Sequence, residues 1–225
     1  MVIKIGHRGA MEYELENSPS SIKKALELPI DMIEIDVRKC KTGEIVVIHD
    51  ETVDRVTNGE GEVRNKSLKE LKELDLINGE KILTLNEALS IIDRNKKINI
   101  ELKGSGTAKL VSKIIKNHLE KGWGKEDFLV TSFMYYRLQR MRERKLKIGT
   151  GLIMIISPLL LNVPVEKIDT EFMILRKEFI NKEIIKDLHS MGTRVIAWVV
   201  NRKEEIERIK ELGIDGIISD YPERI

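Results

Sequence analysis

The sequence has almost no cysteine, with Cys40 the single one among 225 residues. A lone cysteine cannot form an internal disulfide, which excludes a disulfide-stapled scaffold and fits a reducing compartment. The N-terminus also lacks a basic segment followed by a long apolar core and a small-residue cleavage site, so we expect no signal peptide. These absences together predict a cytoplasmic protein.

An excess of charge of one sign is also missing. The 39 Lys and Arg residues nearly balance the 37 Asp and Glu residues, which leaves a net charge of +2. No long basic block alternates with aromatic residues, so nucleic acid is not an expected partner. A phosphorylated small molecule remains compatible, because a local pocket does not require a global charge.

No uninterrupted apolar run is long enough to cross a membrane. The most apolar stretch, residues 148–165, is broken by Gly149, Gly151, Pro158 and Asn162, whereas a membrane span needs roughly 20 mainly apolar residues. We interpret this stretch as a buried strand followed by an apolar loop. We therefore expect no stable membrane insertion.

The chain also lacks a linker rich in Pro, Gly or Ser, so we predict one domain over residues 1–225. Short β-branched runs alternate along it with amphipathic helical segments. The expected strands are residues 2–5, 32–37, 45–48, 98–102, 128–131, 148–153, 172–175, 195–200 and 216–219. Apolar runs that alternate with helices are typical of parallel strands covered on both faces, which predicts an α/β fold, a (β/α)8 TIM barrel.

Nine strands are one more than a closed eight-stranded barrel requires. The doubtful region is residues 38–44, which join two of the strands and are too few for a helix. A hairpin and a crossover without a helix are both compatible with them. The following segment, residues 51–80, carries an Asn58-Gly59 turn signal. We predict a small insertion at the barrel mouth there, after the His49-Asp50 strand.

Several helix starts are marked by residues that can cap a backbone N–H group. Ser67 and Thr84 each have a glutamate three residues later, the spacing of a capping box. The expected N-caps are Ser18, Ser67, Thr84, Asn181 and Asn201. The last two would begin helices that end near Gly192 and Gly213, where a left-handed residue is needed before a strand.

Three carboxylates fall at or near strand ends. Glu34 and Asp36 are two residues apart in one strand, so both side chains face the same way. Glu101 lies at the end of another strand. Converging carboxylates are costly to bury unless a cation or a proton joins them, and oxygen ligands suit Mg²⁺ or Ca²⁺. The alternative is a set of rim charges bridged by Lys or Arg.

Histidines and cations follow the same strand ends. His7 and His49 each directly follow a β-run, and such a pair can share acid and base duties near neutral pH. The alternative is that each histidine caps a strand-end carbonyl. Arg8 and Lys103 supply fixed positive charge suited to phosphate oxygens. A cation, two basic side chains and two histidines predict a site for an anionic diester.

The motifs, in their order along the chain, resemble the glycerophosphodiester phosphodiesterase family. The resemblance runs from end to end and is weakest between about residues 149 and 188. The matching motifs are His7–Ala10, Glu16–Ser18, Glu34–Val37, Val46–Asp50, Asp54–Gly59, Glu101–Lys103, Ser132-Phe133, Trp198–Asn201 and Asp215–Asp220. Two departures from the family pattern, Leu15 and Val199, fall on supporting positions.

The resemblance implies a barrel enzyme that hydrolyses glycerophosphodiesters to glycerol phosphate and an alcohol, in lipid and glycerol metabolism. It implies metal ligands at Glu34, Asp36 and Glu101, for Mg²⁺ or Ca²⁺, and an acid–base pair at His7 and His49. The substrate-binding positions that it implies are Arg8, Lys103, Glu16, Phe133 and Trp198. Trp198 would form an aromatic wall for the glycerol. The nucleophile is either water or the neighbouring glycerol hydroxyl, which would give a cyclic phosphate first.

Other functions are also compatible with parts of the sequence. The apolar stretch 153–165 fits a lysophospholipase D-type activity on the same site, because an exposed apolar surface at the mouth of the barrel would accept an acyl chain. The same stretch fits a buried strand with a contact in a possible homodimer. A phosphate- or sugar-binding barrel would need a catalytic position to be lost. A sugar-phosphate isomerase barrel would not need three carboxylates and two histidines.

Overall fold

The computed structural model describes residues 2–155 and 168–225. Within them, nine strands form one sheet in the order β1-β9-β8-β7-β6-β5-β4-β2-β3, and β1 also pairs with β2. Neighbouring strands are parallel except β2 and β3. Because β1 pairs with β2, the eight parallel strands close into a barrel. The predicted (β/α)8 barrel is therefore confirmed.

The strands lie close to where the apolar runs predict them. They are β1 (Ile3–Gly6), β2 (Met32–Lys39), β3 (Ile45–Val47), β4 (Lys97–Leu102), β5 (Phe128–Ser132), β6 (Gly149–Met154), β7 (Phe172–Arg176), β8 (Arg194–Trp198) and β9 (Gly216–Ser219). Most of their residues are buried, as expected when helices cover one face of each strand and the barrel interior the other. The strand predicted over residues 195–200 ends earlier, at Trp198.

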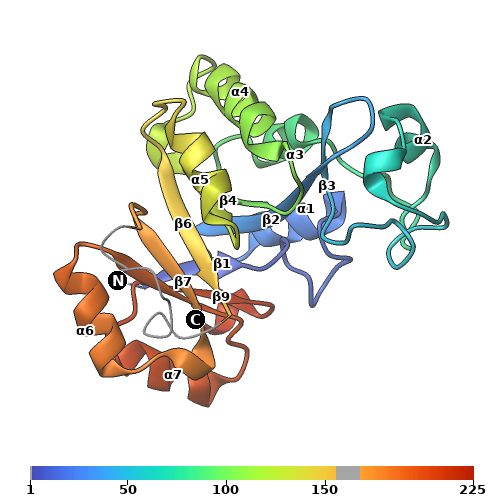
Figure 1. The fold of residues 1–225 in the computed structure, drawn as a ribbon. Coiled ribbons are helices and arrows are strands. Elements are labelled where there is room, and N and C mark those ends of the chain that lie inside the picture. The colour runs from blue at the N-terminus through green and yellow to red at the C-terminus, as the bar shows by residue number, and fades with distance from the viewer. Residues whose placement is uncertain (1, 156–167) are drawn as a thin grey trace.

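The described residues form seven α-helices. They are α1 (Pro19–Glu27), α2 (Leu68–Glu73), α3 (Leu85–Ile92), α4 (Thr107–Leu119), α5 (Tyr135–Arg142), α6 (Lys182–Ser190) and α7 (Lys203–Glu211), with short 3-10 turns η1 (Val63–Asn65), η2 (Lys125–Asp127), η5 (Lys177–Phe179) and η6 (Pro222–Arg224). All of them except α2, in the insertion, surround the barrel (Figure 1). In Figure 1, α3, α4 and α5 lie on one side of the barrel and α6 and α7 on the other. None of the helices in the described ranges is long and apolar enough to span a membrane.

Four of the five expected N-caps are confirmed. The side chains of Ser18, Ser67, Thr84 and Asn181 each accept a hydrogen bond from a backbone N–H in the first turn of their helix. The prediction for Asn201 is wrong, because Arg202 is the N-cap of α7 and provides no side-chain cap. The amide of Asn201 instead donates to Asp220 Oδ2 at 2.6 Å. The side chain of Asn201 therefore holds the residue that follows β9 and does not cap a helix.

The connection from Asp36 to His49 is a hairpin. Strand β3 runs antiparallel to β2, with Val37 opposite Val47, so β3 is not a barrel strand. Gly43 in the turn has φ of +103°, which favours glycine. The pairing continues beyond β3, because the N–H of Ile48 donates to the carbonyl of Asp36 at 3.0 Å. The hairpin therefore returns the chain to the barrel rim and places His49 beside the end of β2.

The insertion after His49 has a small apolar core of its own, which packs on this hairpin. Its members come from the hairpin and from the segment beyond it: Cys40, Val46, Ile48, Val53, Val56, Val63, Leu71, Leu76 and Ile82. The barrel interior is filled separately by Ile5, Met32, Leu129, Ile153, Phe172, Ile174, Ile196 and Ile218. Figure 1 shows the insertion with α2 standing to one side of the barrel, beyond β3. The insertion thus supports the segment that carries His49.

Candidate active site

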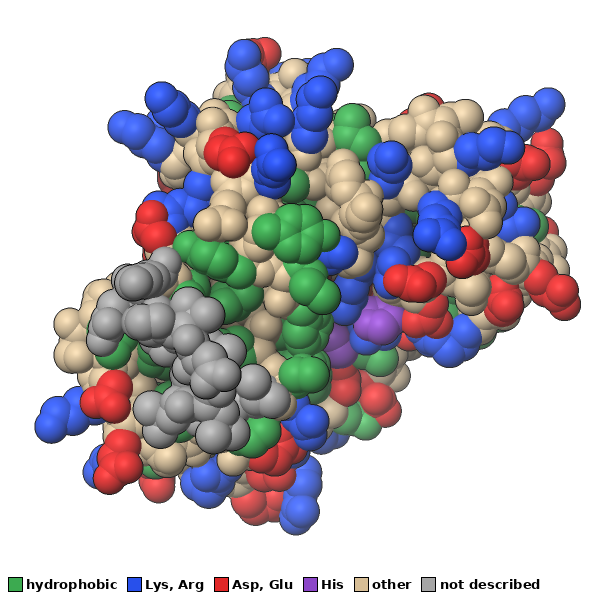
Figure 2. All heavy atoms as spheres, viewed as in Figure 1, with side chains coloured by type: hydrophobic (Ala, Val, Ile, Leu, Met, Phe, Trp, Pro, Cys, Tyr) green, Lys and Arg blue, Asp and Glu red, His purple; other side chains and the backbone are tan. Residues whose placement is uncertain are grey.

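A pocket opens at the carboxyl-terminal ends of the barrel strands, where barrel enzymes place their sites. Its lining consists of His7, Arg8, Glu34, His49, Asn99, Glu101, Lys103, Phe133, Ile153, Ile174, Trp198 and Ile218. Figure 2 shows histidine between a band of hydrophobic side chains and a group of charged ones. Eight of the ten predicted site residues line this pocket. Asp36 and Glu16 lie next to it and contact the lining residue Arg8.

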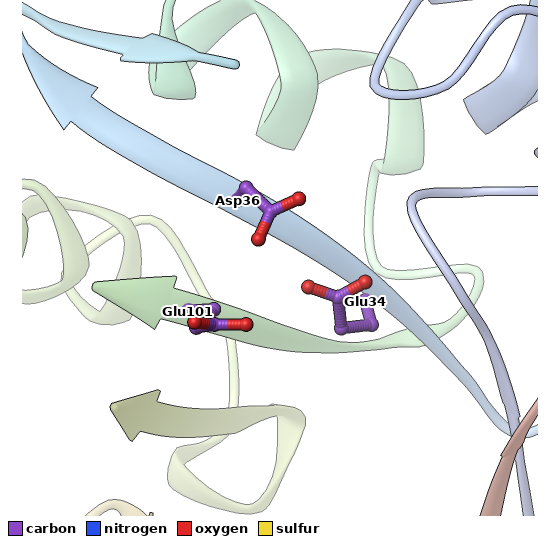
Figure 3. Close-up of side chains that lie close together, drawn as sticks. All are labelled: Glu34, Asp36 and Glu101. Atoms are coloured by element: carbon purple, nitrogen blue, oxygen red, sulfur yellow. The ribbon is translucent and has the colours of Figure 1, made fainter. Parts of the chain in front are cut away.

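The three predicted carboxylates converge (Figure 3). Glu34 and Asp36 both come from β2, and Glu101 lies opposite Asp36 on the neighbouring strand β4. One carboxylate oxygen of each residue lies within 4.8 Å of the other two. The exposed fractions are 3% for Glu34, 1% for Asp36 and 8% for Glu101. The two-residue spacing of Glu34 and Asp36 in β2 therefore does bring both side chains to one face of the strand, and that face is buried.

The electrostatics of this cluster favour a bound cation. Burial, together with the charges of Asp36 and Glu101, raises the pKa of Glu34 well above its usual value. Burial, with Asp36, raises the pKa of Glu101 to about 7. Within the described residues, Glu34 Oε1 is buried without a hydrogen-bond partner. An oxygen-only donor set with an unsatisfied buried oxygen fits a hard divalent cation.

Asp36 differs from its two neighbours because cations surround it. Burial raises its pKa, but the charges of Lys103 and Arg8 outweigh burial and hold that pKa below its usual value. Lys103 Nζ lies 3.3 Å from Asp36 Oδ1 and 2.7 Å from Glu101 Oε1. Asn17 contacts Asp36 twice. Its Nδ2 donates to Asp36 Oδ2 at 3.0 Å, and its Oδ1 accepts from the backbone N–H of Asp36 at 3.1 Å. Sequence reasoning placed Asn17 in a motif without giving it this role.

His7 is held from the far end of the chain. Its Nδ1 lies 2.6 Å from Asp220 Oδ1, and Asp220 directly follows β9. Burial raises the pKa of Asp220, but the hydrogen bond with His7, the charge of His7 and the hydrogen bond from Asn201 together outweigh burial and lower that pKa. Asn201 holds the second oxygen of Asp220. Because Nδ1 is engaged, proton exchange with a substrate falls to Nε2 of His7.

His49 is held by its neighbour in sequence. Its Nδ1 lies 2.6 Å from Asp50 Oδ1, and Asp50 Oδ2 accepts from Arg55 Nε at 2.6 Å. The hydrogen bond from Arg55 is the main reason that the pKa of Asp50 falls to about 2. Burial lowers the pKa of His49, and Asp36 and Asp50 only partly oppose that effect. A neutral imidazole in this position is able to accept a proton near neutral pH.

Arg55, in the insertion, joins His49 to Arg8. Its guanidinium donates to both oxygens of Glu16, at 2.7 Å and 2.8 Å. Glu16 in turn accepts from Arg8 NH1 at 2.8 Å. Burial raises the pKa of Glu16, but the hydrogen bonds from Arg55 and the charge of Arg8 outweigh burial and lower it. Sequence reasoning placed Arg55 within a motif and did not identify this link.

The turn after β1 places Arg8 over the carboxylates. Arg8 has φ of +49° and Gly9 has φ of +87°, and the backbone N–H of Arg8 donates to Glu34 Oε2 at 2.7 Å. A Cβ at position 9 would stand 2.3 Å from Ser21 Oγ and 2.8 Å from the carbonyl carbon of Ser21. Glycine is therefore required there both by conformation and by the close approach of α1.

Two aromatic side chains form part of the apolar wall of the pocket. Phe133 and Trp198 meet edge to face, with ring centroids 5.6 Å apart. Lys103 Nζ lies 5.3 Å from the centroid of Phe133. Trp198 Nε1 is buried, and the described residues offer it no hydrogen-bond partner. The wall thus carries one donor that a bound molecule could satisfy.

A closed barrel with buried carboxylates and two carboxylate-held histidines at its rim fits a hydrolase for anionic esters. The profile of the glycerophosphoryl diester phosphodiesterase family matches residues 7–224. The chain therefore belongs to the glycerophosphoryl diester phosphodiesterase family. The predicted resemblance and the prediction of an enzyme, a phosphoric diester hydrolase, are both confirmed.

Individual phosphodiesterases are similar to the chain in sequence and in structure. A glycerophosphodiester phosphodiesterase from Caldanaerobacter subterraneus subsp. tengcongensis is 35% identical over 237 aligned positions, covering 98% of this chain and 95% of that protein. The structure of an Oleispira antarctica phosphodiesterase in complex with the product sn-glycerol-3-phosphate has a TM-score of 0.89 and 28% identity, covering 98% and 94% of the two chains. A Thermotoga maritima glycerophosphodiester phosphodiesterase has a TM-score of 0.82 and 28% identity, covering 99% and 96%.

Proposed function

We propose that this protein hydrolyses glycerophosphodiesters to glycerol phosphate and an alcohol, with a divalent cation and with His7 and His49 as the acid–base pair. The observation that carries the proposal is the convergence of three buried carboxylates and two carboxylate-held histidines at one pocket. Family membership supports the reaction, as does the glycerol phosphate product bound in the Oleispira relative.

Glu34, Asp36 and Glu101 are the residues that would hold the cation, Mg²⁺ or Ca²⁺. The unsatisfied Glu34 Oε1 and the oxygen-only donor set support this assignment. When bound, the cation would neutralise negative charge on the phosphodiester and so stabilise the transition state. Without it, the raised pKa values of Glu34 and Glu101 imply that a proton replaces part of its charge near neutral pH.

Arg8 and Lys103 would bind the nonbridging phosphate oxygens. Both line the pocket, and both lie among carboxylates that hold them in place. Charged donors fixed before the substrate arrives need little reorganisation as charge develops in the reaction. Glu16 supports this task through its contact with Arg8, so its role is to position the guanidinium. Trp198 and Phe133 would contact the glycerol, and the open Nε1 of Trp198 would donate to a hydroxyl.

The two histidines would divide the proton transfers. One imidazole takes the proton from the attacking hydroxyl as its oxygen bonds to phosphorus. The bond from phosphorus to the alcohol oxygen breaks, and the other imidazole supplies the proton that this oxygen needs. Asp220 and Asp50 would keep the rings oriented through both steps.

Removal of each imidazole tests the proposed roles. His7→Ala and His49→Ala should each lower turnover of glycerophosphocholine by at least about 10³-fold, since each would remove an obligatory proton carrier. His189→Ala is a matched control, because His189 also pairs with an aspartate, at 2.7 Å, but on α6 outside the pocket. Near-normal turnover in either pocket variant would contradict the acid–base assignment.

Lysophospholipase D-type hydrolysis is the second candidate. The apolar wall of the pocket favours it, with Ile153, Ile174 and Ile218 beside the two aromatic rings. Ile155, which directly follows β6 and is 56% exposed, favours it as well. Most of the apolar stretch 153–165, which motivates this candidate, lies outside the described residues. Comparing the turnover of glycerophosphocholine with that of a lysophosphatidylcholine distinguishes the two activities. A cytoplasmic location, a single domain and a homodimer stay predictions.

A further inference from the structure

A second cavity lies directly beside the active-site pocket and is strongly basic. It has a volume of about 360 Å³ and shares Lys103 with the pocket. We call it the basic cleft, and its cationic lining residues are Arg38, Lys39, Lys41, Arg64, Lys103 and Arg137. Only two carboxylate residues in the described part of the chain, Glu51 and Glu62, line it as well. The cleft is therefore positive although the whole chain is close to neutral.

The positive charge of the basic cleft is not cancelled by these two carboxylates. Glu62 is fully engaged by Arg64, with contacts of 2.7 Å and 3.0 Å. The side chain of Glu51 is 79% exposed and lies 3.5 Å from Arg38 NH1, so solvent weakens this pair. In the described residues, the side chains of Lys39 and Lys41 form no ion pair. Both ammonium groups thus remain available to an incoming anion, and the charge of Lys41 acts only at longer range, on the carboxylate of the exposed residue Glu70.

The backbone at the start of α4 adds to the positive potential of the basic cleft. Lys39 ends β2, and its Nζ lies 3.5 Å from the place where a Cβ on Gly106 would stand. Gly106 is the N-cap of α4, a helix of 13 residues that begins without a side-chain cap. The positive end of the helix dipole therefore lies next to Lys39. Arg137 is fixed at the cleft by donating to the carbonyl of Leu102 at 2.7 Å.

The position of the basic cleft relative to the apolar wall matters for a diester. The cleft lies at the ends of β2 and β4, whereas Trp198 ends β8, which is separated from β4 by three strands on one side of the barrel and from β2 by two on the other. A phosphodiester has two arms that leave the phosphate in different directions. If the glycerol contacts Trp198, the other arm would be directed toward Lys103, the residue that the basic cleft shares with the pocket.

We propose that the basic cleft binds an anionic group on the alcohol arm, such as a phosphate monoester. The preferred substrates are then glycerophosphodiesters whose alcohol carries a second negative charge. Contacts to a remote anion contribute binding energy that holds the scissile phosphate in place. This inference rests on the proposed diester hydrolysis and adds the chemical class of the alcohol, which membership of the family does not specify.

A matched pair of substrates tests the inference. Glycerophosphoinositol and glycerophosphoinositol 4-phosphate differ by one phosphate group, and the wild-type enzyme should have a kcat/KM at least about tenfold higher for the phosphorylated one, the size expected of one charge-assisted contact. The Lys39→Gln/Lys41→Gln double variant should lose this preference and keep the wild-type rate with glycerophosphoinositol. Lys113→Gln, an exposed lysine of α4 that does not line the cleft, should change neither rate.

Two results would overturn the inference: no preference in the wild type, or an equal loss with both substrates in the double variant. Binding of inositol 1,4-bisphosphate, measured by calorimetry, separates this inference from the proposed reaction. Tight binding to the wild type and its loss in the double variant support the cleft even if no diester is hydrolysed. Equal binding to both proteins contradicts it.

Discussion

Each histidine of the pocket depends on a carboxylate, and each of those carboxylates depends on a further side chain. Asp220 holds His7 and is itself held by Asn201. Asp50 holds His49 and is itself held by Arg55. Such pairs fix the tautomer and the orientation of the ring, so that one defined nitrogen faces the reacting atoms. Loss of a supporting residue should therefore reduce catalysis without removing an imidazole.

Asp220→Asn tests the support of His7. We expect kcat to fall by about 10²-fold or more, because a neutral amide no longer stabilises the imidazolium or its tautomer. Asp215→Asn provides the comparison, since Asp215 pairs with His189 away from the pocket. Steady-state kinetics with thermal melts of both variants are the measurement. An Asp220 variant with unchanged kcat would show that this pair does not assist proton transfer.

Arg55→Ala tests the link between the insertion and the site. The arginine contacts both Asp50 and Glu16, so its loss should loosen His49 and Arg8 together. We expect a fall in kcat of about 10²-fold, with partial recovery in Arg55→Lys, because lysine keeps the charge without the two-pronged contact. Lys69→Ala, an exposed position of α2, serves as the control. Equal kinetics for the two alanine variants would exclude a positioning role for Arg55.

At the scale of elements, two turns place most of the site. The turn after β1 carries Arg8 over the end of β2, and the β2–β3 hairpin returns His49 to the same rim. The conformations of these two turns determine where the guanidinium of Arg8 and the imidazole of His49 lie.

Gly9→Ala tests the first turn, with Gly43→Ala as a matched control. Both glycines have a positive φ, but a Cβ at position 43 meets nothing within 4 Å, whereas one at position 9 collides with Ser21. We expect Gly43→Ala to lower the free energy of unfolding by about 1 kcal/mol from backbone strain alone. Gly9→Ala should cost about 2 kcal/mol more and reduce activity, because overpacking displaces the turn. Urea unfolding measures both, and equal costs would contradict the steric explanation.

At the scale of the whole molecule, the cation site couples stability to pH. The pKa of Glu101 is raised to about 7 and that of Glu34 is raised well above its usual value. The metal-free folded protein therefore binds these protons more tightly than the unfolded chain does. The corresponding stabilisation is complete below about pH 4.5 and is lost as pH rises through about 7.

Melting temperatures in excess chelator should therefore fall between pH 5 and pH 8 more steeply for the wild type than for Glu101→Gln. Added Mg²⁺ or Ca²⁺ should raise the wild-type melting temperature more at pH 8 than at pH 5, because the cation competes with the protons. A cation effect that does not depend on pH would contradict binding at these carboxylates.

Much of the fold could be predicted because parallel strands and their helices have local patterns. The barrel, the insertion and four of the five N-caps all follow from apolar runs and cap residues close together in sequence. The hairpin could not be distinguished from a crossover, because two apolar runs with a short polar connection fit both. Asn201 was assigned to the wrong partner, since an asparagine before a helix has the same local pattern whether it caps that helix or not.

Seven of the predicted site residues were found by their places at or near strand ends, and Glu16, Phe133 and Trp198 by the family resemblance. The contacts that these residues make could not be predicted in either way. His7 and Asp220 are 213 residues apart in sequence, and only closure of the barrel brings β1 beside β9. Arg55 reaches Glu16 because the insertion packs back over the rim. Partners that meet through tertiary packing leave no spacing in the sequence, so these supporting residues emerge only from the structure.

Cation dependence of turnover is the most direct test of the proposed chemistry. The chelator-treated enzyme is assayed for release of glycerol phosphate from glycerophosphocholine, as a function of added Mg²⁺ or Ca²⁺. Turnover should be nearly absent in excess chelator and should return with a saturable dependence on one of these cations. Glu101→Gln should need a much higher cation concentration, since one of the three converging carboxylates is lost. Full turnover in excess chelator would contradict a cation held by Glu34, Asp36 and Glu101.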